Sequence, residues 1–170
     1  MRSERLLDML TDQKLREVLA YDLTTGVFTW RRNVYRAKAG QKAGHKRPDN
    51  YCAITINQRQ YRAHRLAWLY VYGEWPRSEL DHINGDPADN RIANLRLATR
   101  SANSANTRKK CSSRNALKGV SFEKRGGRYR AQIRIQGKNT YLGTYDTEEE
   151  AHAAYVAAAE KEFGAFARAE

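Results

Sequence analysis

The sequence predicts an α+β protein built from two small modules. Residues 79–108 follow the order strand, long loop, strand and helix. Residues 118–163 follow a different order, three strands and then a helix. A polar, basic stretch at 106–118 separates the two patterns, and such a change of composition is typical of a domain boundary. With 170 residues, the chain has the length of one compact domain or of two small ones.

The first 49 residues predict a helix, a hairpin and a basic loop. Residues 1–20 fit a short amphipathic helix that Thr11 or Asp12 would cap. Its apolar positions recur at helical spacing, namely Leu15, Val18 and Leu19. A Thr-Thr-Gly turn between apolar flanks predicts a hairpin over 21–30. Residues 31–49 are rich in Lys and Arg, and both a phosphate-contacting arm and a solvated loop fit them.

A second hairpin and a buried helix are predicted next. Residues 51–56 alternate in polarity as a strand does, and 57–60 turn the chain back into a strand at 61–63. Residues 64–73 predict a buried helix with a glycine at its end. We interpret His64 at its start as a structural histidine with satisfied hydrogen bonds, not as a ligand.

The acid and histidine at the end of the next strand carry the candidate chemistry. Asp81 and His82 are adjacent, Asn94 follows in a polar loop, and Asn103 lies on the helix. Mg²⁺ prefers oxygen ligands, which a carboxylate and an amide supply, and it completes its shell with water and phosphate. His82 points to the other side of the strand, and an imidazole suits a general base near neutral pH. Ordinary turn chemistry is the alternative for such an Asn-rich loop.

The last third predicts a three-stranded sheet followed by a helix. The strands are expected at 118–122, 128–135 and 139–145, with turns rich in glycine between them. Thr147 and Glu150 form the pattern of a capping box, and apolar residues follow at helical spacing. The helix is therefore expected to pack one face against the sheet.

The charges of this last third predict which face meets nucleic acid. The chain has 31 Lys and Arg against 19 Asp and Glu, a net charge of +12, which indicates a polyanionic partner, with nucleic acid as the first candidate. A ribosomal or merely solubilising role is the alternative. Residues 108–138 hold eleven Lys and Arg residues and one acidic residue, whereas residues 146–170 hold seven Asp and Glu residues and two basic residues. The sheet, not the helix, should therefore face the nucleic acid.

Within the middle strand the residues divide between two faces. Tyr129, Ala131, Ile133 and Ile135 should pack on the helix. The exposed face should carry Arg128, Arg130, Gln132 and Arg134. Such a face can read bases in the major groove or bind phosphate alone, and both alternatives stay open. The basic linker residues expected to follow the DNA backbone are Lys109, Lys110 and Arg114.

The segment ELDHINGDPADNRIANLRLATRSANSANTR at 79–108 resembles the catalytic unit of HNH endonucleases, in the variant where Asn replaces the last His. HRLAW at 64–68 also recurs in the phage-type members of that family. The resemblance implies a ββα-metal (His-Me finger) fold, with Asp81 and Asn103 holding one divalent ion, Mg²⁺ or Mn²⁺. It implies His82 as the general base and Asn94 as the residue that ties the loop together and orients the site.

The C-terminal pattern resembles the APETALA2/ethylene-response-factor DNA-binding domain. The resemblance rests on KGV at 118–120, RYRAQIR at 128–134 and YLGTYDTEEEAHAAY at 141–155. It implies that Lys118 and Tyr141 contact DNA. Ser121 replaces an Arg of the plant proteins, so their target sequence does not carry over.

Together these patterns predict a metal-dependent DNA endonuclease, similar to phage or prophage homing endonucleases, whose partner is double-stranded DNA. We expect a nuclease domain at 1–107, with its catalytic unit at about 78–108, a basic linker at 108–116 and a DNA-binding domain at 117–170. One active site per chain and no dimer-like seam predict a monomer that nicks, or cuts the strands in turn. The alternatives are a non-catalytic DNA-binding regulator that keeps a nuclease scaffold and, third, an RNA-binding protein, which would need exposed aromatic pairs on the sheet.

The cysteines and apolar runs predict the compartment. Cys52 and Cys111 are too few and too far apart for a disulfide framework or a Cys-rich zinc site. No run reaches the roughly 18 apolar residues of a membrane span, and residues 1–10 lack the core of a signal peptide. We expect a cytoplasmic protein without a membrane partner, in the host cell's cytoplasm if a phage encodes it.

Overall fold

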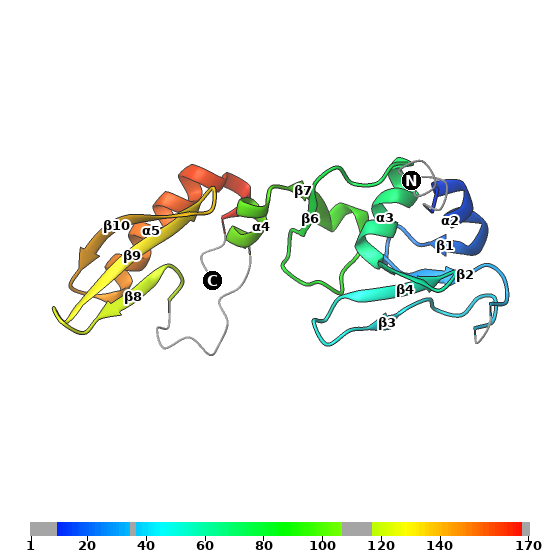
Figure 1. Cartoon of the computed structure of the whole chain (residues 1–170), viewed down its shortest axis with the longest axis horizontal. Helices are drawn as coiled ribbons and strands as arrows, with labels where there is room; N and C mark the ends of the chain where they lie inside the picture. The colour runs from blue at the N-terminus through cyan, green and yellow to red at the C-terminus, as the bar shows by residue number, and fades with distance from the viewer. Residues whose placement is uncertain (1–9, 35–36, 107–116, 168–170) are drawn as a thin grey trace, which may run out of the picture. The chain divides into compact units, whose positions relative to one another are not determined.

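The computed structural model describes residues 10–34, 37–106 and 117–167. The chain forms two compact units, Met1–Leu97 and Ala98–Glu170 (Figure 1). The expected linker at 108–116 lies outside the described residues, so the expected domain boundaries stay a prediction. Of the helices within the described ranges, none is both long and apolar enough to pass through a bilayer.

The first unit begins with a helix and a short hairpin. Helix α2 (Asp12–Val18) starts after Thr11, whose hydroxyl accepts a hydrogen bond from the Lys14 backbone N–H at 3.3 Å. Strands β1 (Leu19–Tyr21) and β2 (Phe28–Trp30) pair antiparallel, as expected for a hairpin. The helix prediction was wrong at its end, because Leu19 is extended and pairs with Trp30 in the hairpin.

A three-stranded antiparallel sheet follows, in the order β3-β4-β5. Its strands are β3 (His45–Lys46), β4 (Cys52–Ile56) and β5 (Arg59–Arg62). The turn before β5 is shorter than expected, because Asn57 and Gln58 both adopt left-handed φ values, 48° and 64°, that close a two-residue hairpin loop. Strand β3 lies within a stretch expected to be loop, and its two exposed residues leave no periodic signal.

Helix α3 (Ala63–Tyr72) supplies much of the core of the first unit. It ends at Gly73, whose positive φ of 76° lets its N–H reach the Leu69 carbonyl at 2.9 Å. Its buried face packs with residues from α2, β1, β2 and β4 in one cluster. The largest fully buried side chains of that cluster are Leu15, Leu19, Ile54, Leu66 and Leu69.

The expected order of strand, loop, strand and helix is observed. Strand β6 (Glu79–His82) lies next to β7 (Leu95–Ala98) in a two-stranded sheet, and the one-turn helix η1 (Ile92–Asn94) ends the loop between them. Helix α4 (Arg100–Asn106) belongs to the second unit. The assembly of β6, β7 and α4 into one ββα-metal site therefore stays a prediction.

The second unit has the expected three strands and helix. Strands β8 (Val120–Glu123), β9 (Arg128–Ile135) and β10 (Lys138–Tyr145) form an antiparallel sheet in the order β10-β9-β8. Helix α5 (Glu148–Phe163) lies along one face of that sheet, and the short helix η2 (Gly164–Phe166) follows it (Figure 1). The capping box of Thr147 and Glu150 is present, and the α+β class is confirmed.

Candidate active site and nucleic-acid interface

Asp81 and His82 end strand β6 and are both buried, with 3% and 5% of their surface exposed. Arg96 on β7 donates a hydrogen bond from Nε to Asp81 Oδ2 at 2.8 Å. A carboxylate this buried needs a charged or hydrogen-bonding partner, because taking an ion out of water is costly. Arg96 is a candidate site residue that sequence analysis missed, since only the arrangement of β6 beside β7 reveals the contact.

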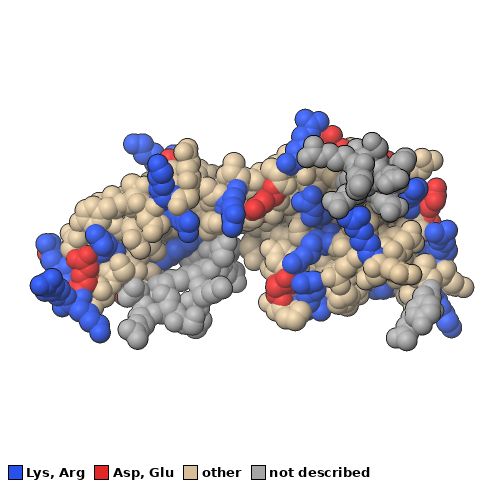
Figure 2. All heavy atoms as spheres, in the orientation of Figure 1, with Lys and Arg blue, Asp and Glu red and all other residues tan. Residues whose placement is uncertain are grey.

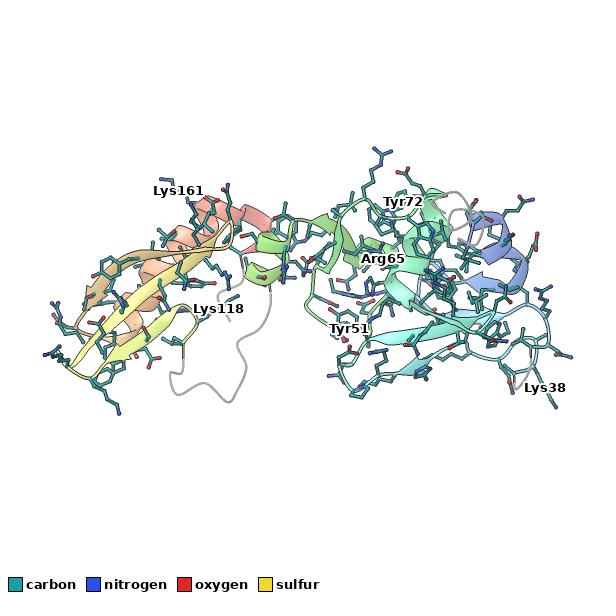
Figure 3. All side chains as sticks on the ribbon, in the orientation of Figure 1. Lys38, Tyr51, Arg65, Tyr72, Lys118 and Lys161 are labelled. Atoms are coloured by element: carbon teal, nitrogen blue, oxygen red, sulfur yellow. The ribbon has the colours of Figure 1, made fainter. Side chains whose placement is uncertain are left out.

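Three side chains surround the imidazole of His82. The Nε2 atom lies 3.5 Å from Asn90 Oδ1, and the ring centre lies 5.1 Å from that of His64 and 5.8 Å from that of Tyr51. Burial lowers the pKa of His82, while the Asn90 contact acts in the opposite direction. The ring is therefore neutral at pH 7, which is the form that can accept a proton. Figure 3 labels Tyr51, just before β4.

His64, at the start of α3, is buried with 8% of its surface exposed. Its Nδ1 atom has no hydrogen-bond partner, so the interpretation of His64 as a fully satisfied structural histidine is wrong for this atom. Burial, and then the neighbouring His82, lower the pKa of His64 to about 3. The ring is thus neutral and places no charge beside His82.

The loop between β6 and β7 is held by the side chain of Asn94. Its Oδ1 accepts a hydrogen bond from the Asn84 backbone N–H at 3.0 Å. Its Nδ2 donates to Asn84 Oδ1 at 3.0 Å and to the Asp89 carbonyl at 2.9 Å. The Arg91 guanidinium beside Asp89 lowers the pKa of that carboxyl to about 2 and pairs with it at 2.6 Å. These bonds close the loop next to Asp81, and any direct part of Asn94 in catalysis stays a prediction.

The hairpin of β1 and β2 contacts the same loop. The Tyr21 hydroxyl donates a hydrogen bond to the Asn90 carbonyl at 2.7 Å. Burial raises the pKa of Tyr21 to about 12, so the phenol keeps its proton and remains a donor. Gly26, at the hairpin turn, lies so close that a Cβ there would stand 2.4 Å from the Arg91 nitrogen. The loop therefore rests on a turn that only glycine permits.

The expected second metal ligand, Asn103, lies on α4 in the second unit, so its pairing with Asp81 stays a prediction. Its backbone N–H donates to the Thr99 carbonyl at 2.9 Å, as a helical residue does. Among the residues that the structure describes, no group of three or more His, Cys, Asp or Glu side chains is placed to hold a metal. One carboxylate and one amide oxygen fit a hard ion that keeps water and phosphate oxygens, such as Mg²⁺ or Mn²⁺.

A small group of charged residues lies beside Tyr51. The Arg62 guanidinium stands 4.7 Å from the Tyr51 ring centre and pairs with Asp49 at 2.9 Å. Arg47 pairs with the same carboxylate at 3.5 Å and donates to Gln60 at 2.6 Å. These contacts do not test whether residues 31–49 form a phosphate-contacting arm or a solvated loop.

The exposed face of β9 carries the residues expected there. Its side chains facing solvent are Arg128, Arg130, Gln132 and Arg134, whereas Ala131 and Ile133 are buried beneath α5. Tyr141 on β10 pairs in register with Gln132, is 56% exposed, and lies 5.1 Å from the Arg130 guanidinium. Figure 2 shows Lys and Arg gathered at the lower left end of this unit, where Figure 1 has the turn between β8 and β9, with Asp and Glu among them.

Two of these arginines already have acidic partners. Arg128 pairs with Asp146 at 2.8 Å and Arg130 with Glu123 at 3.4 Å. Both pairs are exposed, and exposed pairs contribute little, so a phosphate can replace the carboxylate.

Another expected DNA contact, Lys118, is directed toward the helices instead of toward this face. Lys118, labelled in Figure 3, donates its ammonium to the Ala105 carbonyl and lies 6.0 Å from the Tyr155 ring centre, toward α4 and α5. Lys109, Lys110 and Arg114 lie outside the described residues. Their contacts with DNA stay a prediction.

Comparison with known proteins supports both halves of this picture. A family model described as HNH endonuclease matches residues 61–105, and one described as AP2 domain matches residues 115–165. Protein 3.8 of Escherichia phage T7 is 33% identical over 89 residues, which cover 52% of this chain and 74% of that protein. The first match includes Asp81, His82, Asn94 and Asn103, and the second includes the exposed face of β9. The resemblance to an HNH nuclease followed by an AP2 domain is confirmed.

Proposed function

The chain belongs to the same family as Protein 3.8 of Escherichia phage T7 and joins an HNH endonuclease domain to an AP2 domain, and we therefore propose a metal-dependent DNA endonuclease of the homing type. The two domains support a DNA nuclease with its own DNA-binding module. The observation that carries the finer proposal is the buried pair of Asp81 and His82, with Arg96 and Asn90 as their partners.

His82 acts as the general base in this proposal. Its neutral imidazole takes a proton from a water molecule, and the hydroxide formed attacks the phosphorus. The P–O3′ bond breaks as the new P–O bond forms, and the 3′ oxygen leaves and then takes up a proton. The products are a 5′-phosphate and a 3′-hydroxyl. Because burial lowers the pKa of His82, the base form persists below the pH at which a solvated histidine becomes charged.

Asp81 and Asn103 would hold the divalent ion. When bound, such an ion supplies positive charge opposite the phosphate oxygens and the departing oxygen. Both donors are hard oxygens, which fits Mg²⁺ or Mn²⁺ better than Zn²⁺. Arg96 compensates the Asp81 carboxylate at 2.8 Å and keeps the carboxylate oriented on β6.

The AP2 domain delivers the nuclease to its target. The exposed face of β9, with Tyr141 beside it, offers guanidinium and amide groups to a DNA groove. Arg128 and Arg130 exchange their exposed carboxylate partners for phosphates or base edges. Each chain holds one proposed active site, so a monomer should nick one strand or cut the two strands in turn.

A non-catalytic DNA-binding regulator is the second candidate. The two exposed ion pairs on β9 and its neighbours would serve DNA binding equally well without any cleavage. The retained pair of Asp81 and His82 favours the nuclease, because a scaffold alone does not require a buried acid beside a buried base.

The deciding experiment is cleavage of supercoiled plasmids that carry phage or host DNA, with Mg²⁺, with Mn²⁺ and with EDTA. Wild type should convert supercoiled plasmid to open circles in a metal-dependent manner, and His82→Ala should not. His45→Ala is the matched control, because His45 is an exposed histidine of the same unit. The ratio of open-circle to linear product reports nicking.

The outcomes separate the candidates. Binding without cleavage under either metal favours the regulator. Cleavage that survives in His82→Ala contradicts the assignment of the base.

A second experiment tests the DNA interface. Arg130→Gln should weaken DNA binding and reduce the slope of log affinity against log salt concentration by about one counterion. An unchanged slope would mean that Arg130 does not contact DNA phosphate.

A further inference from the structure

Asn90 lies in the loop between β6 and β7 and is buried, with 4% of its surface exposed. Neither its residue type nor its place in the loop gave it a role in the sequence analysis. Its backbone carbonyl accepts the hydrogen bond from the Tyr21 hydroxyl at 2.7 Å. Its side chain points to the His82 ring, with Oδ1 3.5 Å from Nε2. Asn90 is therefore held from one side and faces the proposed base on the other.

The orientation of the Asn90 amide is fixed by a second contact. Its Nδ2 donates to the Ala88 carbonyl at 3.0 Å. A carbonyl oxygen can only accept a hydrogen bond, so the amide nitrogen must lie on that side. An amide whose nitrogen is placed this way cannot flip without losing that bond, and its oxygen must then face His82.

This orientation decides which nitrogen of His82 carries the hydrogen. The Asn90 oxygen can only accept, so Nε2 of His82 must be the donor. A neutral imidazole has one N–H, and if it is at Nε2 then Nδ1 is the basic nitrogen. The rings of His64 and Tyr51, with centres 5.1 Å and 5.8 Å from that of His82, limit rotation of the imidazole away from this arrangement.

We propose that Asn90 is a positioning residue that selects the Nε2–H tautomer of His82 and so leaves Nδ1 as the atom that takes the proton from water. The catalytic part of this inference rests on the proposed nuclease function. When Nδ1 accepts the proton, the imidazolium still donates from Nε2 to the Asn90 oxygen, so the contact also stabilises the charged ring. Asn90 touches neither water nor phosphate in this scheme and acts through His82 alone.

The tautomer can be measured on the full chain without DNA or metal. Long-range ¹H–¹⁵N correlation spectra of the ¹⁵N-histidine-labelled protein at pH 8 distinguish a protonated Nε2 from a protonated Nδ1. The chain has only four histidines, so single His→Gln variants assign the signals. Wild-type His82 should show a protonated Nε2 and an unprotonated Nδ1. A protonated Nδ1 in the wild type would overturn the proposal, with no variant needed.

Variants then test whether Asn90 is the cause. Asn90→Leu keeps the size of the side chain and removes the acceptor, so His82 should become a mixture of tautomers. Tyr21→Phe is the matched control, because it removes the hydrogen bond to the Asn90 backbone carbonyl and leaves the side-chain amide in place. The control should keep the wild-type tautomer. Unchanged tautomers in a folded Asn90→Leu would overturn the proposal.

Cleavage kinetics provide a separate reading. Loss of the hydrogen bond that orients a metal-bound histidine typically lowers activity on the order of 10- to 100-fold, and we expect an effect of similar size for a histidine base. For Asn90→Leu we expect that loss in kcat, with KM nearly unchanged, since Asn90 does not touch DNA. A loss confined to KM would contradict the positioning role. If the wild type never cuts DNA, the nuclease proposal fails, whereas the spectra still decide whether Asn90 sets the tautomer.

Discussion

Replacement of Asn94 by alanine should destabilise the first unit, because the side chain of Asn94 makes three hydrogen bonds that close the loop after His82. They join it to the Asn84 backbone N–H, to Asn84 Oδ1 and to the Asp89 carbonyl, at 2.9 to 3.0 Å. Asn94 is buried, with 7% of its surface exposed, so water would not fully replace these bonds.

The size of the effect follows from those contacts. Each intramolecular hydrogen bond contributes about 1 kcal/mol net, and a buried partner left unpaired costs somewhat more. Asn84 and Asp89 lie closer to the surface and regain part of the loss by hydration. We therefore expect the free energy of unfolding to fall by about 2–3 kcal/mol. For a unit of this size that corresponds to a decrease in Tm of roughly 10–20 °C.

Tryptophan fluorescence measures this unit alone. The chain has three tryptophans, at positions 30, 68 and 75, and all of them lie within Met1–Leu97. Urea unfolding followed by this signal should show the loss for Asn94→Ala. The control is Asn139→Ala, which removes an exposed asparagine from β10 in the other unit. A change below about 0.5 kcal/mol together with lost cleavage would refute the loop-tying argument and place Asn94 at the phosphate instead.

Three further changes test other contacts. The pKa of His64 is about 3 in the folded chain and about 6.5 in the unfolded chain, so between these pH values the unfolded chain binds one proton more. The free energy of unfolding should therefore rise as the pH is raised from about 3 to about 6.5, by up to about 1.4 kcal/mol per pH unit, and fall as the pH is lowered. His64→Phe should flatten that slope in urea unfolding, and an unchanged slope contradicts the assignment. Arg96→Gln removes the cation that pairs with a buried carboxylate and should destabilise the first unit by about 3 kcal/mol, measured by the same fluorescence, whereas a loss below 1 kcal/mol would mean that the pair contributes little. Gly119→Ala places a Cβ 2.1 Å from Tyr155 at a φ of +78°, so the free energy of unfolding of the second unit, followed by near-UV circular dichroism, should fall by at least about 2 kcal/mol. The control Gly137→Ala has a similar φ of +82° but open space around its Cβ, so its free energy of unfolding should fall less. Equal losses in the two variants would show that the contact with Tyr155 is not decisive.

The elements that carry their own local signal could be predicted from the sequence. Helix α5 begins at a capping box and has apolar residues at helical spacing, and β9 alternates between arginine and apolar residues. Gly73 marks the end of α3, where a left-handed residue is needed. In each of these, the chain encodes the structure within a few neighbouring residues.

Elements that depend on distant partners could not be predicted. Strand β3 exists only because His45 and Lys46 pair with β4, and neither residue has a β pattern of its own. Leu19 fits the spacing of a helix, yet it pairs with Trp30 because the hairpin offers it a partner.

The candidate site shows the same division. Asp81, His82 and Asn94 are recognisable from their residue types and spacing. Arg96 and Asn90 are not, because their importance lies in contacts made across strands and loops, at 2.8 Å to Asp81 and 3.5 Å to His82. Tyr51, just before β4, likewise contacts the two histidines although it precedes both of them in the chain.

The hairpin of β1 and β2 determines where the HNH domain can be separated from the rest of the chain. The HNH match begins at residue 61, but the loop beside His82 leans on Tyr21 and Gly26, and the core that holds α3 includes Leu15 and Leu19. A fragment cut at the boundary of the match would expose that core and release the loop. The smallest fragment that keeps the HNH segment folded therefore has to start before α2, and exchange of HNH segments between related genes would preserve this fold only if the N-terminal hairpin moved with them.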